Sequence, residues 1–352
     1  MRLIRNIVSP NVSLFAVSVN PGLLCRAMSR AKDDPAAMIL ERLKQERIAA
    51  LYHFTSVENL PSIRDTDRLC SKEVLCTLGQ WPCADPGGNQ QSHNLDQQND
   101  NWDKLSLTFT PRTPMAYRKK PLKHLCFCVI DVGAAALPNV VFTDTNATST
   151  IFPHKRDTGI NGLNLVDFGA VRAIPRGWDK DGWVRPVQAE SLIPEALPLA
   201  YVKEIVFVSD ASLAEAERLW GGSPHPPFRV SPEMFSDFPG VLTFSFAFMR
   251  EYFLTDDAID GNNVNQPHAH RIVFERARTQ RIFAVITSHI TAGTVAETTW
   301  NPGNIRSTHT FTTSGNYRHW PRVNAQRLPI GECQVEYRLG GVRWATIPFR
   351  MR

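Results

Sequence analysis

The chain has 352 residues, of which 43% are hydrophobic and 21% are charged, as in an ordinary folded protein. These values exclude a largely disordered chain, a membrane bundle and a small disulfide-stapled domain, and the length favours two domains. The formal net charge of +5 permits a polyanionic partner without requiring one.

The seven cysteines are odd in number and scattered, which predicts reduced thiols in a cytoplasmic protein rather than a disulfide framework. Cys70, Cys76 and Cys83 are spaced too widely for a zinc ribbon, and we expect no metal. Cys126 and Cys128 are expected on one face of a strand, because alternate residues of a strand point the same way.

Residues 1–32 carry arginines and no acid before Asp33, with an apolar patch over Val12–Val19 that mimics a targeting segment. Pro10 and Asn11 precede this patch, and it is too short to span a bilayer. We expect an N-terminal extension without fixed structure and no membrane partner. Met28 offers an alternative start.

The first elements follow in quick succession. Apolar residues at helical spacing predict a helix over Asp33–Ala50, with Pro35 at its first turn. Leu51–Thr55 reads as a short strand, and the Ser56 hydroxyl can cap a helix over Val57–Ile63 by accepting a free backbone N–H.

Residues 79–104 are rich in Pro, Gly, Gln, Asn and Asp, a composition that predicts a long surface loop, and long ordered loops are often functional. The strands expected after it are largely apolar. They are Leu105–Thr110, Lys123–Val132, Val140–Thr143, Ala189–Ile193 and Val202–Ser209.

A helix is expected over Leu213–Trp220, followed by the Gly- and Pro-rich segment 221–227. This segment predicts a boundary between a domain of residues 33–220 and an accessory domain of residues 221–352. Runs typical of an antiparallel sheet, sandwich or barrel follow. They are Val241–Met249, Ile282–Ile290, Thr294–Thr299, Thr308–Thr313, Gln334–Leu339 and Val342–Phe349.

Residues 306–352 contain eight arginines, interleaved with Tyr317, Trp320, Tyr337 and Trp344, against two glutamates. Arginines that follow phosphates and rings that stack on bases are typical of a single-stranded nucleic-acid surface. Ordinary strands with core-facing aromatics and solvated arginines give the same pattern, and the sequence leaves both readings open.

The chain lacks the phosphate-binding loop, dinucleotide-binding, zinc-protease and nucleophile-elbow motifs, which excludes most common enzyme classes. Polar residues instead gather where strands are expected to end. They include His53, Thr55, Asn59, Arg112, Tyr117, Asp144, Asn146 and Glu190, the last in an apolar run where a buried acid needs a reason.

Four segments in one order resemble the DarT family of ADP-ribosyltransferase toxins. They are Tyr52–Thr55 with Glu58–Ile63, Leu107–Tyr117, Val141–Ala147 and Gln188–Glu190, within residues 35–210. The resemblance implies an α+β fold with an ADP-ribosyltransferase-like split β-sheet core around an NAD cleft. The C-terminal mainly-β domain lies outside it and has no assigned role.

The resemblance also implies residue roles. His53 and Thr55 would hold the nicotinamide amide and its ribose, with Asn59 shaping the same wall. Arg112 would face phosphates or orient the acceptor. The remaining three residues are Met115 and Tyr117, which would line the cofactor pocket, and Glu190, which would be the catalytic acid and base.

Two points stay open. Glu190 can instead pair with Arg185 on the surface. The family uses an arginine early in the cleft, for which this sequence offers only Arg64 and Arg68. Two loop histidines, His93 and His154, are alternatives for positioning the acceptor, and this mismatch leaves the acceptor base undecided.

The leading hypothesis is an NAD-dependent mono-ADP-ribosyltransferase that modifies a nucleobase of single-stranded DNA. It implies a toxin of a toxin–antitoxin or phage-defence system, opposed by an antitoxin such as a macrodomain hydrolase. Alternatives are transfer to RNA or to a protein, or an inactive nucleic-acid-binding module. The position two residues before Glu190 is Gln188, which weakens the protein-acceptor alternative because many protein-modifying toxins carry an acid there.

Overall fold

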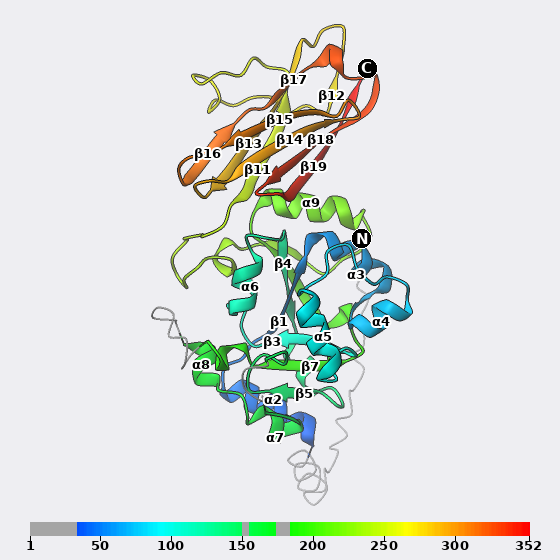
Figure 1. Cartoon of the computed structure of the whole chain (residues 1–352), viewed down its shortest axis with the longest axis vertical. Coiled ribbons are helices and arrows are strands. Elements are labelled where there is room, and N and C mark those ends of the chain that lie inside the picture. The colour runs from blue at the N-terminus through cyan, green and yellow to red at the C-terminus, as the bar shows by residue number, and fades with distance from the viewer. Residues whose placement is uncertain (1–33, 150–154, 174–183) are drawn as a thin grey trace, which may run out of the picture.

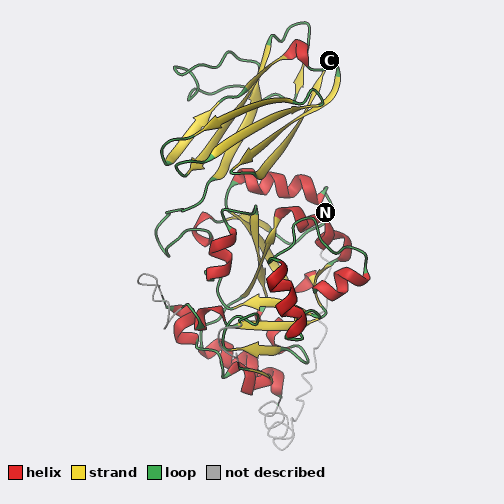
Figure 2. Ribbon diagram, viewed as in Figure 1, coloured by secondary structure: helices red, strands yellow, loops and turns green. Residues whose placement is uncertain are grey.

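The computed structural model describes residues 34–149, 155–173 and 184–352. A lower body of helices and strands, residues 34–236, carries an upper part made almost wholly of strands, residues 248–352 (Figures 1 and 2). We call these the N-terminal body and the sandwich. The predictions for residues 1–32, Cys25 and His154 lie outside the described residues.

The N-terminal body begins with α2 (Pro35–Gln45), β1 (Leu51–Ser56), a 3-10 turn η1 (Val57–Asn59) and α3 (Leu60–Thr66). The elements that follow are β2 (Arg68–Cys70), α4 (Lys72–Thr77), α5 (Gln90–Gln98), β3 (Lys104–Thr108), α6 (Pro114–Lys119), β4 (Leu125–Ile130), η2 (Val132–Ala136), β5 (Val141–Thr143), β6 (Arg156–Thr158), α7 (Gly159–Leu163), α8 (Phe168–Arg172), η3 (Pro186–Gln188), β7 (Glu190–Pro194), β8 (Ala196–Pro198), η4 (Leu199–Tyr201), β9 (Val202–Phe207), α9 (Asp210–Trp220), β10 (Phe228–Val230) and η5 (Pro232–Met234).

Eight strands of the body form one path in the order β10-β9-β4-β1-β3-β7-β5-β6, and β2 pairs with β8 in a separate ribbon. β1 is fully paired with β4, from Leu51 opposite Ile130 to Ser56 opposite Leu125. β1 meets β3 only where Tyr52 faces Thr108, so the path divides there into two half-sheets. This arrangement confirms the predicted α+β class and the split sheet.

The central strand β4 illustrates why the sequence folds this way. All six of its residues are buried, including Cys126 and Cys128, because β1 and β9 flank it and apolar side chains cover both faces. Its apolar run is the signal that predicted a strand there. The described cysteines are all free thiols.

Two predicted segments are wrong in part. The second half of the predicted loop 79–104 forms α5. Asn89 caps the N-terminus of this helix, because its side chain accepts the Ser92 N–H at 2.9 Å. The predicted strand Val241–Met249 is irregular over most of its length, and β11 begins only at Phe248. Before β11, Phe246 is buried and Phe244 packs against the same core, so this part of the apolar run reflects packing rather than strand pairing.

The sandwich consists of two facing sheets. One is antiparallel, of order β11-β13-β16 with β17 beside β13; the other, of order β12-β19-β18-β14-β15, is antiparallel except for β12, which is parallel to β19. Its elements are β11 (Phe248–Thr255), β12 (Val273–Phe274), β13 (Arg281–Ile290), β14 (Val295–Asn301), β15 (Ile305–Thr310), β16 (Gly315–His319), β17 (Arg322–Asn324), η6 (Ala325–Arg327), β18 (Gly331–Leu339) and β19 (Val342–Met351). The predicted mainly-β C-terminal part is confirmed.

The aromatic residues interleaved with the C-terminal arginines divide by burial. Trp344 and Tyr337 are 1% and 0% exposed and fill the core between the two sheets. Four of the arginines form ion pairs with glutamates, among them Arg318 with Glu251 and Arg338 with Glu336. Tyr337 and Trp344 therefore fit the ordinary strand reading, because buried rings cannot stack on bases. The nucleic-acid reading of the exposed arginines stays a prediction.

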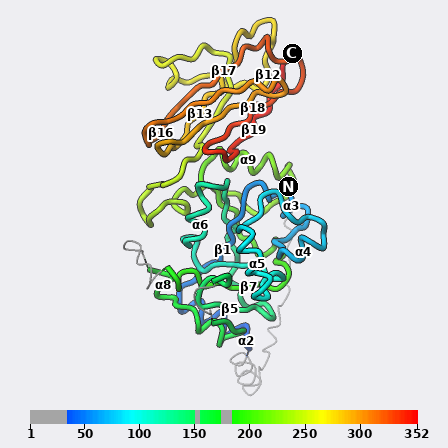
Figure 3. The backbone as a smooth tube through the Cα atoms, in the orientation of Figure 1, coloured from blue at the N-terminus to red at the C-terminus, as the bar shows by residue number. Residues whose placement is uncertain are grey.

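The apolar core runs without a break from the body into the sandwich. Phe127 and Val206 of the main sheet belong to the same buried cluster as Phe235, Phe248 and Trp344. In Figure 3 the last strands of the chain, β18 and β19, lie directly above α9, which packs against β19 and β11. The predicted boundary at residue 221 stays a prediction; beyond it, β10 still pairs with β9 in the body.

Within the described ranges, every helix is too short or too polar to cross a membrane.

Substitution of Trp344 tests this shared core, because its ring contacts His124 of the body and Phe248 of the sandwich. Trp344→Ala is expected to lower the free energy of unfolding by about 3–5 kcal/mol, because it leaves a large cavity. Trp344→Phe, which keeps most of the packing, is expected to lose less than half as much. Urea unfolding measures both; equal losses would contradict a packing role.

Candidate active site

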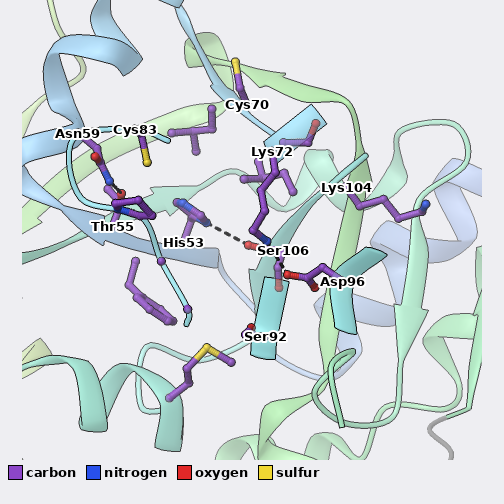
Figure 4. A pocket seen from close by; sticks show the side chains of 18 of the residues that line it. His53, Thr55, Asn59, Cys70, Lys72, Cys83, Ser92, Asp96, Lys104 and Ser106 are labelled. Atoms are coloured by element: carbon purple, nitrogen blue, oxygen red, sulfur yellow. Dashed lines mark hydrogen bonds and ion pairs between the residues drawn. The ribbon is translucent and has the colours of Figure 1, made fainter. Parts of the chain in front are cut away.

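A cavity of about 240 Å³ opens where β1, β3 and β7 come together. Helices α4, α5 and α6 and residues 81–88 close its sides (Figure 4). Five of the seven predicted site residues line it: His53, Thr55, Asn59, Met115 and Glu190.

Strand register explains how residues far apart in sequence meet here. Thr108 of β3 pairs with Tyr52 of β1 on one side and with Glu190 of β7 on the other. His53 follows Tyr52, so its side chain and the Glu190 carboxyl both approach β3. Ser106 lies between them and bonds to both, its carbonyl to His53 and its hydroxyl to Glu190.

Glu190 is held by the segment that follows β5. The Ala147 N–H donates to the Glu190 carboxylate at 2.8 Å, and the Glu190 N–H donates to the Thr143 hydroxyl at 3.1 Å. Glu190 is only 6% exposed. The alternative that it pairs with Arg185 on the surface is therefore wrong.

Burial, with a smaller contribution from the neighbouring Asp96 carboxyl, raises the pKa of Glu190 to about 7. The hydrogen bonds from Ala147 and Ser106 and the charge of Lys72 oppose the rise. A carboxyl with a pKa near neutrality can both accept and release a proton at physiological pH. Groups tuned in this way gather at active sites.

His53 is held as a neutral ring. Its Nδ1 lies 3.0 Å from the Ser106 carbonyl oxygen, which can only accept, so Nδ1 carries the proton and Nε2 keeps its lone pair. Burial lowers the pKa of His53, and the nearby Lys72 charge lowers it further. The neutral ring can therefore donate from Nδ1 and accept at Nε2.

Asn59 joins two walls of the cavity. Its amide donates to the Thr55 hydroxyl at 3.1 Å and to the Asp85 carbonyl at 2.9 Å, and its carbonyl accepts the Asp85 N–H at 2.9 Å. An ion pair between Asp85 and Lys123 adds a second attachment. Asn59, which follows β1, and Lys123, which follows α6, thus hold residues 81–88 over the cavity through their contacts to Asp85.

Lys72 and Asp96 also line the cavity, and the sequence did not predict either of them there. Lys72 Nζ lies 2.5 Å from Asp96 Oδ2 inside the cavity wall, and both act on the Glu190 pKa (Figure 4). Asp96 is the buried residue of α5, a helix with one apolar residue, Leu95, and therefore no apolar stripe that would predict it from the sequence. A Ser71 cap before Lys72 was the one available signal for α4.

The two candidate early arginines have different places. Arg64 donates to the carbonyls of Leu219 and Trp220 at the end of α9, and it is not among the lining residues. Arg68 lies at the cavity edge. The cation whose charge acts on both His53 and Glu190 is Lys72.

His93 does not reach the cavity either. Its ring packs edge-on against Trp81 and Trp102, and its Nε2 bonds the Gly87 carbonyl at 2.6 Å. These contacts fasten residues 81–88 to α5.

Arg112 and Tyr117 lie outside the lining of the cavity. The Arg112 guanidinium donates to the Glu233 carbonyl at 3.1 Å, and the Tyr117 hydroxyl bonds Ser245 at 2.9 Å. Both therefore contact residues 233–245, which end the body and lead into the sandwich. Thr113 caps α6 by accepting the Ala116 N–H, and this start turns Met115 toward the cavity.

The described residues contain no cluster of three or more His, Cys, Asp or Glu side chains that could hold a metal ion.

A family model described as ssDNA thymidine ADP-ribosyltransferase, DarT, matches residues 52–236, which is more than half of the chain. Every residue that lines the cavity falls within this range. The match extends past the resemblance at 35–210 to include β10, and it stops before the sandwich.

A curated relative is a DNA ADP-ribosyl transferase–DNA ADP-ribosyl glycohydrolase fusion protein of Thermosipho africanus, 28% identical over 178 residues. The match covers 48% of this chain and 44% of the relative, so this chain spans less than half of the relative's length.

Two similar solved structures are DarT of Thermus sp. 2.9 in complex with NAD+ and DarTG of Thermosipho africanus in complex with ADP-ribose. Both are 20% identical and cover 53% of this chain. They match over 97% and 51% of their own chains, with TM-scores of 0.42 and 0.43.

The raised pKa of Glu190 predicts a pH-dependent stability. The folded state keeps a proton up to about pH 7 that an ordinary glutamate releases near 4.5, so the free energy of unfolding falls as the pH rises between these values. Glu190→Gln is expected to be more stable than the wild type by about 1–3 kcal/mol near pH 8, and by close to nothing at about pH 4.

Urea unfolding at several pH values measures this difference. The exposed Glu332→Gln serves as control and is expected to show no such trend. A difference for Glu190→Gln that stays constant with pH would contradict the burial argument.

Proposed function

The chain belongs to the DarT family of ssDNA thymidine ADP-ribosyltransferases, and from this premise we propose that it transfers ADP-ribose from NAD to a nucleobase of single-stranded DNA. The observation that carries the proposal is the buried Glu190 carboxyl beside His53 in the cavity. NAD is a substrate here, consumed in each turnover.

The reaction breaks the bond between the nicotinamide nitrogen and the anomeric carbon of its ribose. Nicotinamide leaves with the bonding electrons, and a nitrogen of the nucleobase forms the new bond to that carbon. His53 and Thr55 offer donors and acceptors for the nicotinamide amide and the ribose. A negative Glu190 favours the positive charge that develops on the ribose, because the cavity excludes water around it.

Glu190 also completes the proton balance. As the nucleobase nitrogen forms its new bond, its proton passes to the carboxylate and then to solvent. The acting form is the carboxylate, which predominates above pH 7 because burial raises the pKa of Glu190 to about 7. The hydrogen bonds from Ala147 and Ser106 stabilise this ionised form.

Among the cations that line the cavity, Lys72 is the one whose charge acts on both His53 and Glu190. Its ammonium group is paired with Asp96 and lies near both His53 and Glu190. We propose that it attracts the phosphates of NAD and keeps Glu190 ionised. This role would replace the early-cleft arginine that the sequence lacks.

The acceptor strand is proposed to approach over α6. Residues 105–130 contain no acid but carry Arg112, Arg118, Lys119, Lys120 and Lys123. Arg118 is exposed and Lys119 lines the cavity, so cations extend from the cavity onto the surface of α6. Cations along such a path are what a single strand's phosphates require.

An unopposed activity of this kind would damage the cell that makes it. We propose that the protein acts as a toxin and that a DNA ADP-ribosyl glycohydrolase reverses its product. The support is the fusion relative, whose name joins the two activities in one chain.

Label transfer tests the function. Labelled NAD is incubated with single-stranded DNA, RNA or protein, using wild type, Glu190→Gln and the distant control Glu332→Gln. We expect label on DNA nucleotides with wild type and the control, and at least a hundredfold less with Glu190→Gln. Label on RNA or protein alone would show that DNA is not the acceptor. Absence of label together with absence of released nicotinamide would contradict the proposed enzyme activity.

The path over α6 predicts a salt effect. The double variant Arg118→Ala, Lys119→Ala is expected to raise KM for single-stranded DNA about tenfold. The slope of log KM against log salt concentration is expected to fall by about two, because two phosphate contacts are lost. Arg278→Ala with Arg306→Ala, both on the sandwich and exposed, is the control. Equal changes in the two double variants would show a general charge effect and would contradict the path.

A further inference from the structure

The turn η1, which follows β1, touches the cavity on one side and the sandwich on the other. Ser56 caps it by accepting the Glu58 N–H, and Asn59 at its end lines the cavity. Glu58 in the middle faces away from the cavity, toward β19. One short turn therefore carries both a proposed NAD-binding residue and a contact to a part of the chain nearly three hundred residues later.

The contact to β19 is a bidentate ion pair between Glu58 and Arg343. Arg343 Nε lies 3.0 Å from one Glu58 carboxylate oxygen, and a second guanidinium nitrogen bonds the other oxygen. Both side chains are about three-quarters buried. Two parallel bonds fix direction as well as distance, which a single lysine contact would not do.

A second contact holds the start of the same turn. The Val57 N–H donates to the His124 carbonyl at 2.8 Å. The His124 ring is completely buried, packs 4.2 Å from the Trp344 ring of β19, and bonds Ser212 of α9 at 2.7 Å. Burial lowers the pKa of His124 to about 3, so the ring is neutral and does not repel Arg343.

The same strand is also fixed to α9. The Thr346 N–H donates to the Glu215 carboxylate at 3.2 Å, and Arg218 pairs with that carboxylate at 2.7 Å. Residues 343–346 thus contact η1, His124 and α9 together. These contacts fix the position of β19, and thus of the sandwich, relative to η1.

On the cavity side, the position of η1 determines where Asn59 lies. Asn59 in turn holds the Thr55 hydroxyl and both backbone groups of Asp85. A shift of η1 would move Asn59, and with it residues 81–88 and the Thr55 hydroxyl. The chain of contacts from Arg343 to this wall has only two side-chain steps, through Glu58 and Asn59.

We propose that Arg343 is a positioning residue for NAD binding, so that the sandwich, which lies outside the matched family region, forms part of the enzyme's NAD site. This inference rests on the proposed function. It gives the accessory part a role: with Arg343 in place, η1 holds the NAD-binding wall in its competent position. Displacement of β19, by a partner or by truncation, weakens NAD binding without touching the cavity.

The test compares Arg343→Ala, Arg343→Lys and Glu58→Gln with Arg350→Ala. Arg350 is the matched control, because it lies on the same strand and pairs with Glu332 on the exposed side. NAD affinity is measured by calorimetry, and KM and kcat by label transfer to single-stranded DNA. We expect Kd and KM for NAD to rise about tenfold in Arg343→Ala with kcat within about twofold, and no change in Arg350→Ala.

A charge swap separates positioning from a general loss of structure. Glu58→Arg combined with Arg343→Glu restores the pair in reverse and is expected to recover NAD affinity to within about threefold of wild type. Either single reversal alone is expected to weaken binding more than Arg343→Ala. Arg343→Lys keeps the charge but loses the fork, and is expected to lie between wild type and Arg343→Ala.

Unchanged NAD affinity in folded Arg343→Ala would overturn the proposal, as would equal loss in Arg350→Ala or no recovery in the swap. If wild type binds NAD but transfers no label, the proposed function fails and the affinity comparison still decides the role of Arg343. If wild type binds no NAD, both proposals fail.

Discussion

The cavity exists because β1 and β3 pair at one position only. Where Tyr52 faces Thr108 the two half-sheets share a ladder, and beyond that position the strands diverge. A continuous ladder would have brought β1 and β3 together along their whole length and left no space between them. The divergence instead lets the Ser106 carbonyl bond the His53 ring, and it lets side chains from both half-sheets face one space.

The residues in that space are arranged at a cost to stability. Burial makes the ionised form of Glu190 unfavourable, and the Ala147 N–H, the Ser106 hydroxyl and the charge of Lys72 offset this only in part. A direct ion pair with Lys72 would lower the pKa of Glu190 more strongly, but Lys72 pairs with Asp96 instead. The site therefore keeps Glu190 close to its point of ionisation, a state suited to a group that must gain and lose a proton.

The sequence predicted the parts that depend on apolar runs and motif residues. β4 and most sandwich strands follow their hydrophobic patterns, and His53, Thr55, Asn59, Met115 and Glu190 meet in one cavity. The roles of these residues stay predictions, and Arg112 and Tyr117 turn toward residues 233–245 instead, because the start of α6 orients the helix.

The missed features share one cause. α5 is polar apart from Leu95, so no apolar periodicity marks it. The role of its one buried residue, Asp96, becomes apparent only with Lys72 opposite it. The contact between Glu58 and Arg343 likewise joins residues far apart in the chain. Pairings of this kind arise from the tertiary fold, and a single sequence carries no local signal for them.

The unbroken core between body and sandwich limits how this protein can evolve. A chain that ended at residue 236 would leave Phe127, Phe235 and their neighbours facing water, and such an apolar face invites aggregation. The sandwich is therefore poorly exchangeable: a substitute would need a matching apolar face for the body and an arginine opposite Glu58. Changes in its sequence that suit a new binding partner are confined to the surfaces remote from α9, where they leave this shared face intact.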